Sequence, residues 1–294
     1  MADEPVRYRS GEEDSGRWLE FDFRPDDIVI STRSKSGTTW LQMICALLIF
    51  ESPNLPKPLA ELSPWLDWLI LPKEQLFADL RSQQHRRFIK THTPLDGLPL
   101  HDGVTHIVAA RHPLDAAVSL YHQGQNINRE RLSELLGDPA LAASRTSPPL
   151  DEWLRAWVNS EATANKQLDS FNGVFHHLTD AWERRHDANV LLVHYADLLH
   201  DLPGEMRRIA NQLDIDISEE RLDTLAISAT FESMKNRSEH LAPDPASVLK
   251  DPASFFRKGT SGAGEYALGP EGVARYLERA ERAAPAELLE WLHR

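Results

Sequence analysis

The stretch Ile28-Val29-Ile30-Ser31-Thr32-Arg33-Ser34-Lys35-Ser36-Gly37-Thr38-Thr39-Trp40 runs on into an apolar segment at residues 41–50. A β-branched run that breaks into small polar residues and then resumes as a long apolar segment is typical of a strand, a tight loop and a buried helix. The first turn of such a helix has unpaired backbone N–H groups at the positive end of the helix dipole. We therefore predict an anion site for phosphate at this loop, to which Lys35 adds a charge and hydroxyl groups add donors, from Ser36, Thr38 and Thr39.

Three further apolar runs are typical of buried parallel strands, at residues 88–89, 107–110 and 190–193. Helical stretches separate these runs, and we expect them at residues 39–50, 72–81, 113–125 and 166–186. The alternation predicts one α/β domain over residues 1–294, built on a doubly wound parallel sheet.

The composition narrows the classes of partner and compartment. A formal net charge of −13 opposes general affinity for nucleic acid or an anionic membrane, since their phosphates would be repelled. Cys45 is the single cysteine, so no intrachain disulfide can form. The N-terminal stretch lacks the apolar core of a secretory signal, and residues 41–50 are too short to span a bilayer. We expect a cytoplasmic protein without stable membrane insertion.

Polar side chains follow each predicted strand: Lys35, then Lys90 and His92, then Arg111, then Tyr195. In an open parallel sheet, ligands bind beyond the carboxyl ends of the strands, so these groups should converge on one site. The alternative is that strand ends are polar in any α/β protein because they are wet. A neutral imidazole accepts protons near pH 7, which makes His92 the candidate general base.

Two further segments are suited to binding phosphate. Arg111 offers a forked pair of donors, and Ser119 lies about two turns along the helix expected after Pro113. Near the other end, Arg257 and Lys258 lie in a segment rich in glycine, which suits a mobile lid over residues 250–265. There is an alternative for each of these residues. Arg111 would form a surface ion pair, and Ser119 would only fill a position in the middle of its helix. Arg257 and Lys258 would belong to a solvated basic loop.

The segments 34–40 (SKSGTTW), 88–95 (FIKTHTPL), 111–122 (RHPLDAAVSLYH) and 255–259 (FFRKG) resemble four motifs of the cytosolic-type sulfotransferases. These enzymes use 3′-phosphoadenosine 5′-phosphosulfate (PAPS), and the four motifs occur here in the family's order. The resemblance extends over about residues 26–262 and is greatest to bacterial glycolipid-type sulfotransferases. It implies transfer of a sulfonate group from PAPS to a hydroxyl of a small, largely apolar acceptor, such as a phenol, sterol, lipid or glycolipid.

The resemblance also implies roles for single residues. The catalytic residues would be Lys35, Lys90, His92 and Ser119. The donor would be held by residues of all four motifs and of two intervening segments: Lys35, Ser36, Gly37, Thr38, Thr39, Trp40, Arg111, Ser119, Tyr195, Thr230, Phe231, Met234, Phe256, Arg257, Lys258 and Gly259. No metal is expected on this mechanism.

The acceptor side is less well defined by the sequence. Trp65 and Trp68 lie in an aromatic and branched stretch at residues 64–72, which lines an apolar acceptor pocket or forms an ordinary core helix and turn. Residues 126–165 are expected to be a helical excursion over this side, and residues 1–25 an N-terminal extension.

Two departures from the family's pattern put details in doubt. Arg33 and Ser34 stand where the family often has Tyr-Pro, so a dihedral fixed by proline is absent from the loop. Gly262-Ala263-Gly264 stands in place of Gly-Asp-Trp, which leaves the anchoring of the lid and a possible homodimer open.

Two other functions remain as alternatives. A small-molecule kinase of related fold would need a Walker lysine and carboxylates for Mg²⁺, and neither motif is where such a kinase needs it. A binding module for adenosine bisphosphate that has lost catalysis would not require His92 and Lys90 beside the loop.

Overall fold

Four parallel strands form the centre of the molecule, which we describe from a computed structural model covering residues 4–142, 147–244 and 246–294. The sheet has the order β2-β1-β3-β4, with β1 (Ile28–Ser31) and β3 (Thr105–Ala110) inside and β2 (Phe88–Thr91) and β4 (Val190–His194) at the edges. In the register, Ile30 pairs with both Lys90 and Ile107. The predicted doubly wound α/β fold is confirmed.

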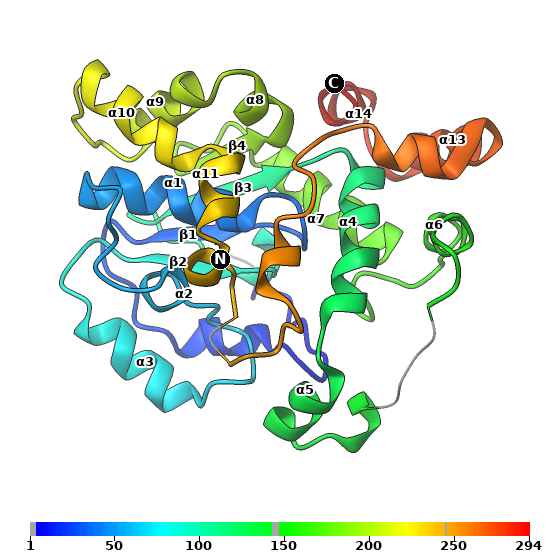
Figure 1. Ribbon diagram of the computed structural model, residues 1–294, viewed down its shortest axis with the longest axis horizontal. Coiled ribbons are helices and arrows are strands. Elements are labelled where there is room, and N and C mark those ends of the chain that lie inside the picture. The colour runs from blue at the N-terminus through cyan, green and yellow to red at the C-terminus, as the bar shows by residue number, and fades with distance from the viewer. Residues whose placement is uncertain (1–3, 143–146, 245) are drawn as a thin grey trace.

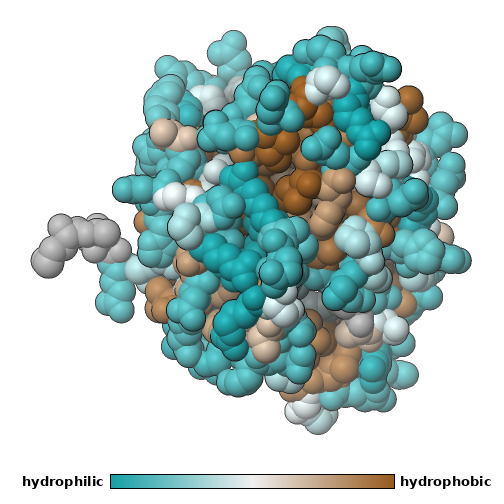
Figure 2. Space-filling model, turned by 90° about the vertical axis from the view of Figure 1, so that its left-hand side faces the viewer, coloured by the Kyte–Doolittle hydropathy of each residue, from teal (hydrophilic) through white to brown (hydrophobic). Residues whose placement is uncertain are grey.

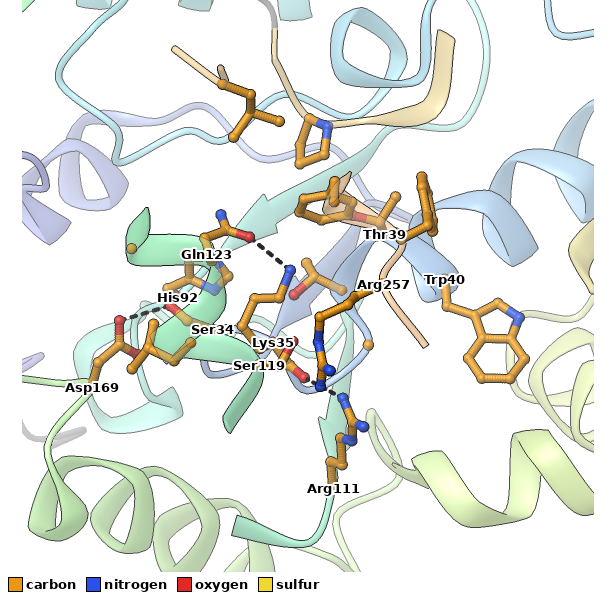
Figure 3. Close-up of a pocket in the computed structure, with 18 of the residues that line it drawn as sticks. Ser34, Lys35, Thr39, Trp40, His92, Arg111, Ser119, Gln123, Asp169 and Arg257 are labelled. Atoms are coloured by element: carbon orange, nitrogen blue, oxygen red, sulfur yellow. Dashed lines mark hydrogen bonds between the residues drawn. The ribbon is translucent and has the colours of Figure 1, made fainter. Parts of the chain in front are cut away.

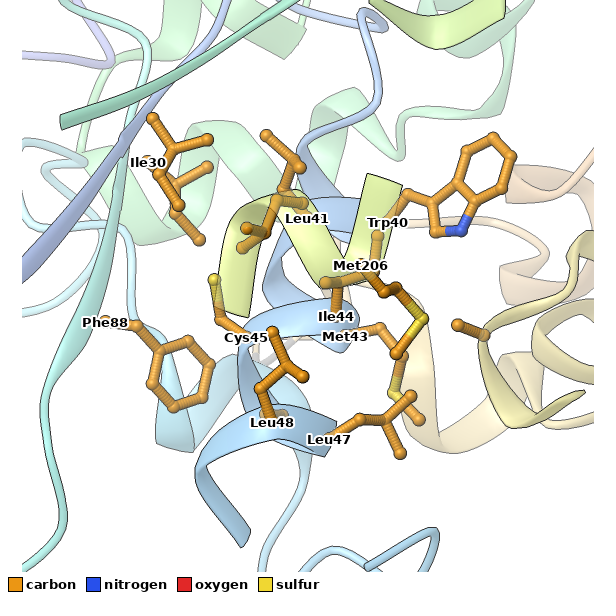
Figure 4. Close-up of a cluster of buried hydrophobic side chains, with 14 of the residues drawn as sticks. Ile30, Trp40, Leu41, Met43, Ile44, Cys45, Leu47, Leu48, Phe88 and Met206 are labelled. Atoms are coloured by element: carbon orange, nitrogen blue, oxygen red, sulfur yellow. The ribbon is translucent and has the colours of Figure 1, made fainter. Parts of the chain in front are cut away.

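One face of the sheet is covered by α1 (Thr38–Phe50), α9 (Leu202–Gln212) and α10 (Glu219–Ala229). Side chains of α1 are buried on all sides, because it packs on β1 and β2 with one flank and on α10 with another. Figure 4 shows Leu41 and Cys45 on the side of α1 that faces Ile30 and Phe88. This packing fixes the start of α1 at the carboxyl end of β1.

The other face is covered by a 3₁₀ turn at Ser15–Glu20, by α3 (Lys73–Ser82) and by α7 (Phe171–Glu183). Alternation along the strands explains the two layers, since Ile28 and Ile30 join the first cluster while Val29 joins the second. Trp18 is fully buried in this second cluster, so the N-terminal stretch packs against the domain.

A third group of helices packs beside the sheet: α4 (Pro113–Asn126), α6 (Leu150–Val158), α13 (Ala263–Ala283) and α14 (Ala286–Leu292). Figure 1 shows them together on the right-hand side. The shorter elements are α2 (Leu59–Leu62), α5 (Arg129–Leu136), α8 (Tyr195–His200), α11 (Phe231–Asn236), α12 (Ser238–Leu241) and the 3₁₀ turns Leu95–Gly97, Pro139–Ala142 and Pro252–Phe255.

The helix expected at 166–186 is shorter than the sequence pattern indicates. It begins at Phe171, because the Ser170 hydroxyl accepts from the Gly173 N–H and caps the helix there. The expected excursion at 126–165 contains α5 and α6, while its residues 143–146 lie outside the described residues, as do 1–3 of the expected extension.

Hydrophilic residues cover most of the face in Figure 2, and apolar residues gather toward its middle. Within the described ranges, no helix combines the length and the apolarity that a bilayer crossing needs.

Candidate active site

The loop between β1 and α1 has the geometry of an anion site. Lys35 and Gly37 adopt positive φ angles of 67° and 113°. A Cβ atom at Gly37 would lie 3.3 Å from the ring of Tyr195, so glycine suits both the backbone and the space. No side chain of the described residues caps the first turn of α1, so its N–H groups are available to an anion.

A pocket of about 290 Å³ opens at the carboxyl ends of the strands. It is lined by all but two of the predicted site residues: Lys35, Gly37, Thr38, Thr39, Trp40, Trp65, Trp68, Lys90, His92, Arg111, Ser119, Tyr195, Phe231, Met234, Phe256, Arg257, Lys258 and Gly259. The exceptions are Ser36, which is buried, and Thr230, whose hydroxyl caps α11 by accepting from the Ser233 N–H.

Cations crowd one part of this pocket. Lys35 donates to Oε1 of Gln123 at 2.7 Å and lies 3.8 Å from the ring centre of Phe255. In Figure 3, Arg111 and Arg257 approach each other near Ser119. Burial, then the charge of Arg111, lowers the pKa of Lys35 to about 7. The pocket therefore holds positive charge in excess, which an anionic ligand would balance.

Arg111 donates to the Lys35 carbonyl at 3.5 Å, and two further contacts hold it in place. Its guanidinium lies 4.4 Å from the ring centre of Tyr195 and donates to the Thr260 carbonyl at 2.9 Å. The stacked ring and the bonded carbonyl fix the direction of the fork, which suits a phosphate group.

His92 lies next to the cations with one nitrogen already engaged. Its Nδ1 is 2.5 Å from the Thr32 carbonyl oxygen, and because a carbonyl only accepts, Nδ1 carries the proton. Nε2 is then the basic nitrogen. Burial, followed by the charges of Lys90 and Arg33, holds the pKa of His92 well below its ordinary value. The imidazole is therefore neutral at pH 7.

Lys90 lies beside His92, with its ammonium group 4.2 Å from the ring centre of Trp65. Burial lowers the pKa of Lys90 to about 8. Trp65 also meets the His92 ring edge-on at 4.6 Å between ring centres, and it stacks on Trp68 at 5.0 Å. The two tryptophans thus form one wall of the pocket beside His92.

Apolar residues continue this wall: Ile127, Leu132 of α5, Val248 and Leu249. Besides Tyr195, five polar lining residues lie outside the four sequence motifs: Glu12, Glu13, Gln123, Asp169 and Thr260. Gln123 was open to prediction, since it lies four residues after Ser119 on the same helix face. Glu12 and Glu13 reach the pocket because backbone pairing of Glu13 with Trp68 brings the N-terminal stretch there, for which the sequence has no local signal.

The segment for which we predict a lid is held at its end by Asp115. Its carboxylate accepts from the Gly262 and Gly264 N–H groups, each at 2.8 Å. A Cβ atom at Gly264 would lie 2.5 Å from the Leu114 backbone, so glycine allows this close approach. The anchoring left open by the sequence is thus provided from α4. Among the described residues, no group of three or more His, Cys, Asp or Glu side chains is arranged to hold a metal ion.

A doubly wound sheet with a phosphate-type loop after its first strand, and with a neutral histidine among cations in the same pocket, is typical of a group transferase that handles an anionic donor. Residues 25–282 match the sulfotransferase domain family, so the chain belongs to that family.

Relatives and solved structures agree with this assignment. The chain is 39% identical to a glycolipid sulfotransferase of Mycobacterium bovis, over 98% of this chain and 94% of the relative. Its fold is similar to a retinol dehydratase crystallised with androsterone and the inactive cofactor PAP, at a TM-score of 0.70 and 24% identity over 92% of this chain and 83% of the other. The fold is also similar to that of mouse sulfotransferase SULT7A1 complexed with PAP, at a TM-score of 0.69 and 23% identity. This match covers 95% of this chain and 92% of the other.

Proposed function

We propose that this sulfotransferase uses PAPS to sulfonate a hydroxyl of an apolar, lipid-like acceptor, with His92 as the general base. The observation that carries the proposal is the convergence of Lys35, Lys90 and His92 in one pocket with Arg111. Family membership favours sulfonate transfer over the kinase alternative.

The residues present fit the donor. The open first turn of α1, with Thr38 and Thr39, suits the 5′-phosphosulfate, and a second cluster suits the 3′-phosphate: Arg111, Ser119, Arg257 and Lys258. The rings of Trp40 and Tyr195, which meet edge-on at 5.1 Å between centres, suit the adenine.

In the proposed reaction, Nε2 of His92 takes the proton of the acceptor hydroxyl while the hydroxyl oxygen bonds to the sulfur of PAPS. The bond between sulfur and the bridging oxygen breaks, and that oxygen keeps the electron pair. Lys35 and Lys90 neutralise the negative charge that develops there. Both lie in a buried, low-dielectric pocket, where such charges act strongly.

The acceptor side supports a lipid-like substrate. The stacked Trp65 and Trp68 beside His92, and the aliphatic wall beyond them, offer an apolar surface to the acceptor. The name of the mycobacterial relative supports a glycolipid among such acceptors. We also keep the cytoplasm as the proposed compartment, which the single free, buried Cys45 fits.

A thermal-shift assay with 3′-phosphoadenosine 5′-phosphate (PAP), compared with ATP plus Mg²⁺, tests donor binding. Transfer from labelled PAPS to a panel of phenols, sterols and glycolipids tests turnover. We expect PAP to raise the melting temperature and an apolar hydroxyl acceptor to become labelled. Stabilisation by ATP alone would support the kinase. Stabilisation by PAP without turnover on any acceptor would support the inactive module.

A further inference from the structure

We propose that Arg33 and Asp169 are positioning residues that lock the base His92 and the loop at residues 34–37 into one rigid unit. The proposal rests on the proposed function, since it concerns the same reaction. It explains how the loop is held although the proline of the family's motif is absent.

The contacts form a continuous bridge across three segments. The Arg33 guanidinium donates to the backbone carbonyl of His92, and its other terminal nitrogen donates to Oδ1 of Asp169 at 2.6 Å. The Ser34 hydroxyl donates to Oδ2 of the same carboxylate at 2.9 Å (Figure 3). One carboxylate thus holds the loop directly through Ser34 and the base indirectly through Arg33.

Asp169 is itself fixed from behind. Its carbonyl accepts from the indole N–H of Trp157 in α6 at 2.8 Å, and Ser170 next to it caps α7. The bridge is therefore tied to α6 of the third group and to α7, which packs on the sheet. Such a support holds reacting groups more accurately than a loop alone would.

Burial makes the bridge hard to replace by water. The Arg33 side chain is 2% exposed and that of Asp169 29%. A buried guanidinium needs its anionic partner, because an unpaired buried charge is costly. The ion pair between Arg33 and Asp169 is thus expected to stay intact while the pocket excludes solvent.

The bridge also places a charge against the base. The groups that face His92 are Lys90 from β2, Arg33 from the loop and His177 from α7. A positive charge at Arg33 disfavours protonation of His92, so the base stays neutral at a lower pH. Removal of this charge raises the pKa of His92 and moves the acid limb of the kcat/KM profile to higher pH.

Kinetics of three variants test the proposal. We expect Asp169→Asn and Arg33→Gln to lower kcat by about 10-fold to 100-fold, since a small displacement of reacting groups has effects of this size. Arg33→Gln should also move the acid limb to higher pH. Arg33→Lys keeps the charge but not the fork, so kcat should fall while the limb stays in place.

Asp27→Asn is the matched control. Asp27 forms a buried ion pair with Arg87 that does not line the pocket, so its loss should lower the melting temperature and leave kcat per folded molecule unchanged. A folded Asp169→Asn enzyme with wild-type kcat and an unmoved limb in Arg33→Gln would overturn the proposal.

Histidine-ring NMR separates this test from the proposed function. The His92 ring should carry its proton on Nδ1 at neutral pH in the wild type and in Arg33→Lys, and should titrate at higher pH in Arg33→Gln. Without turnover in the wild type, these titrations still decide the positioning role: identical curves in all three proteins would overturn it.

Discussion

Burial, more than any single neighbour, determines the protonation of the three central side chains. It is the largest cause of the lowered pKa of Lys35, of Lys90 and of His92. The same burial thus keeps the imidazole of His92 neutral and allows both lysines to gain protons when an anion binds.

Replacement of His92 by alanine removes the proposed base. We expect kcat/KM for the acceptor to fall by about 10² to 10⁴, the usual contribution of general-base catalysis. The affinity for PAP, measured by calorimetry, should stay near the wild-type value, because the donor is held by other residues. An activity near that of the wild type would remove His92 from the role.

Binding of PAP should be coupled to proton uptake at Lys35. Its pKa is about 7 in the free protein, and a nearby phosphate raises it, so between pH 7 and 9 the complex holds more protons than the free components. Affinity should therefore fall as the pH rises above about 7. Calorimetry in buffers of different ionisation enthalpy measures the uptake.

Lys35→Met should reduce this uptake to the share that Lys90 contributes, and Lys166→Met, at an exposed site, should leave it unchanged. Equal proton uptake in the wild type and in Lys35→Met would contradict the assignment.

The motif residues could be predicted from the sequence because their chemistry is local: a loop, a strand end or one helix turn sets where Lys35 and Arg111 point. Glu13 and Asp169 could not be predicted in this way. Their positions depend on pairing with Trp68 and with Arg33, which are distant along the chain.

At the scale of elements, the predicted lid segment is held by one helix terminus. The Asp115 carboxylate, in the first turn of α4, holds the start of α13 through two backbone N–H groups. We expect Asp115→Asn to weaken PAP binding by about 5-fold to 30-fold, equivalent to about 1–2 kcal/mol for hydrogen bonds to a charged group. Calorimetric Kd values measure this change.

Asp223→Asn is the control, because Asp223 is an exposed carboxylate of α10. This variant should bind PAP as the wild type does. An unchanged Kd in Asp115→Asn would show that the lid needs no such anchor.

The stacked tryptophans make a second test at this scale. Replacement of both Trp65 and Trp68 by alanine should raise the acceptor KM, since it removes the apolar wall beside the base. The donor KM should change less. Steady-state kinetics with each substrate varied in turn give both values, and an unchanged acceptor KM would disprove the acceptor role.

Strand positions could be predicted because buried parallel strands are continuous apolar runs, as Ile28 to Ile30 show. The predicted start of α7 is wrong by five residues. The sequence pattern indicates Lys166, and the helix begins at Phe171. The chain at 163–170 is folded in turns closed by backbone bonds such as Gln167 to Thr163, and polarity alone does not distinguish these from a helix.

At the scale of the whole molecule, an acidic chain brings five cationic side chains to one pocket. The net charge is −13, yet the pocket is lined by Lys35, Lys90, Arg111, Arg257 and Lys258. Parallel strands make this possible, because their carboxyl ends bring residues distant in sequence to the same edge. The homodimer suggested by the resemblance remains a prediction.

A crystal structure of the protein with PAP tests the central claim most directly. We expect the 5′-phosphate at the first turn of α1 beside Lys35, and the 3′-phosphate between Arg111 and Arg257. PAP bound instead in the neighbouring hollow lined by His194 and Arg294, with the pocket around Lys35 free, would contradict the account.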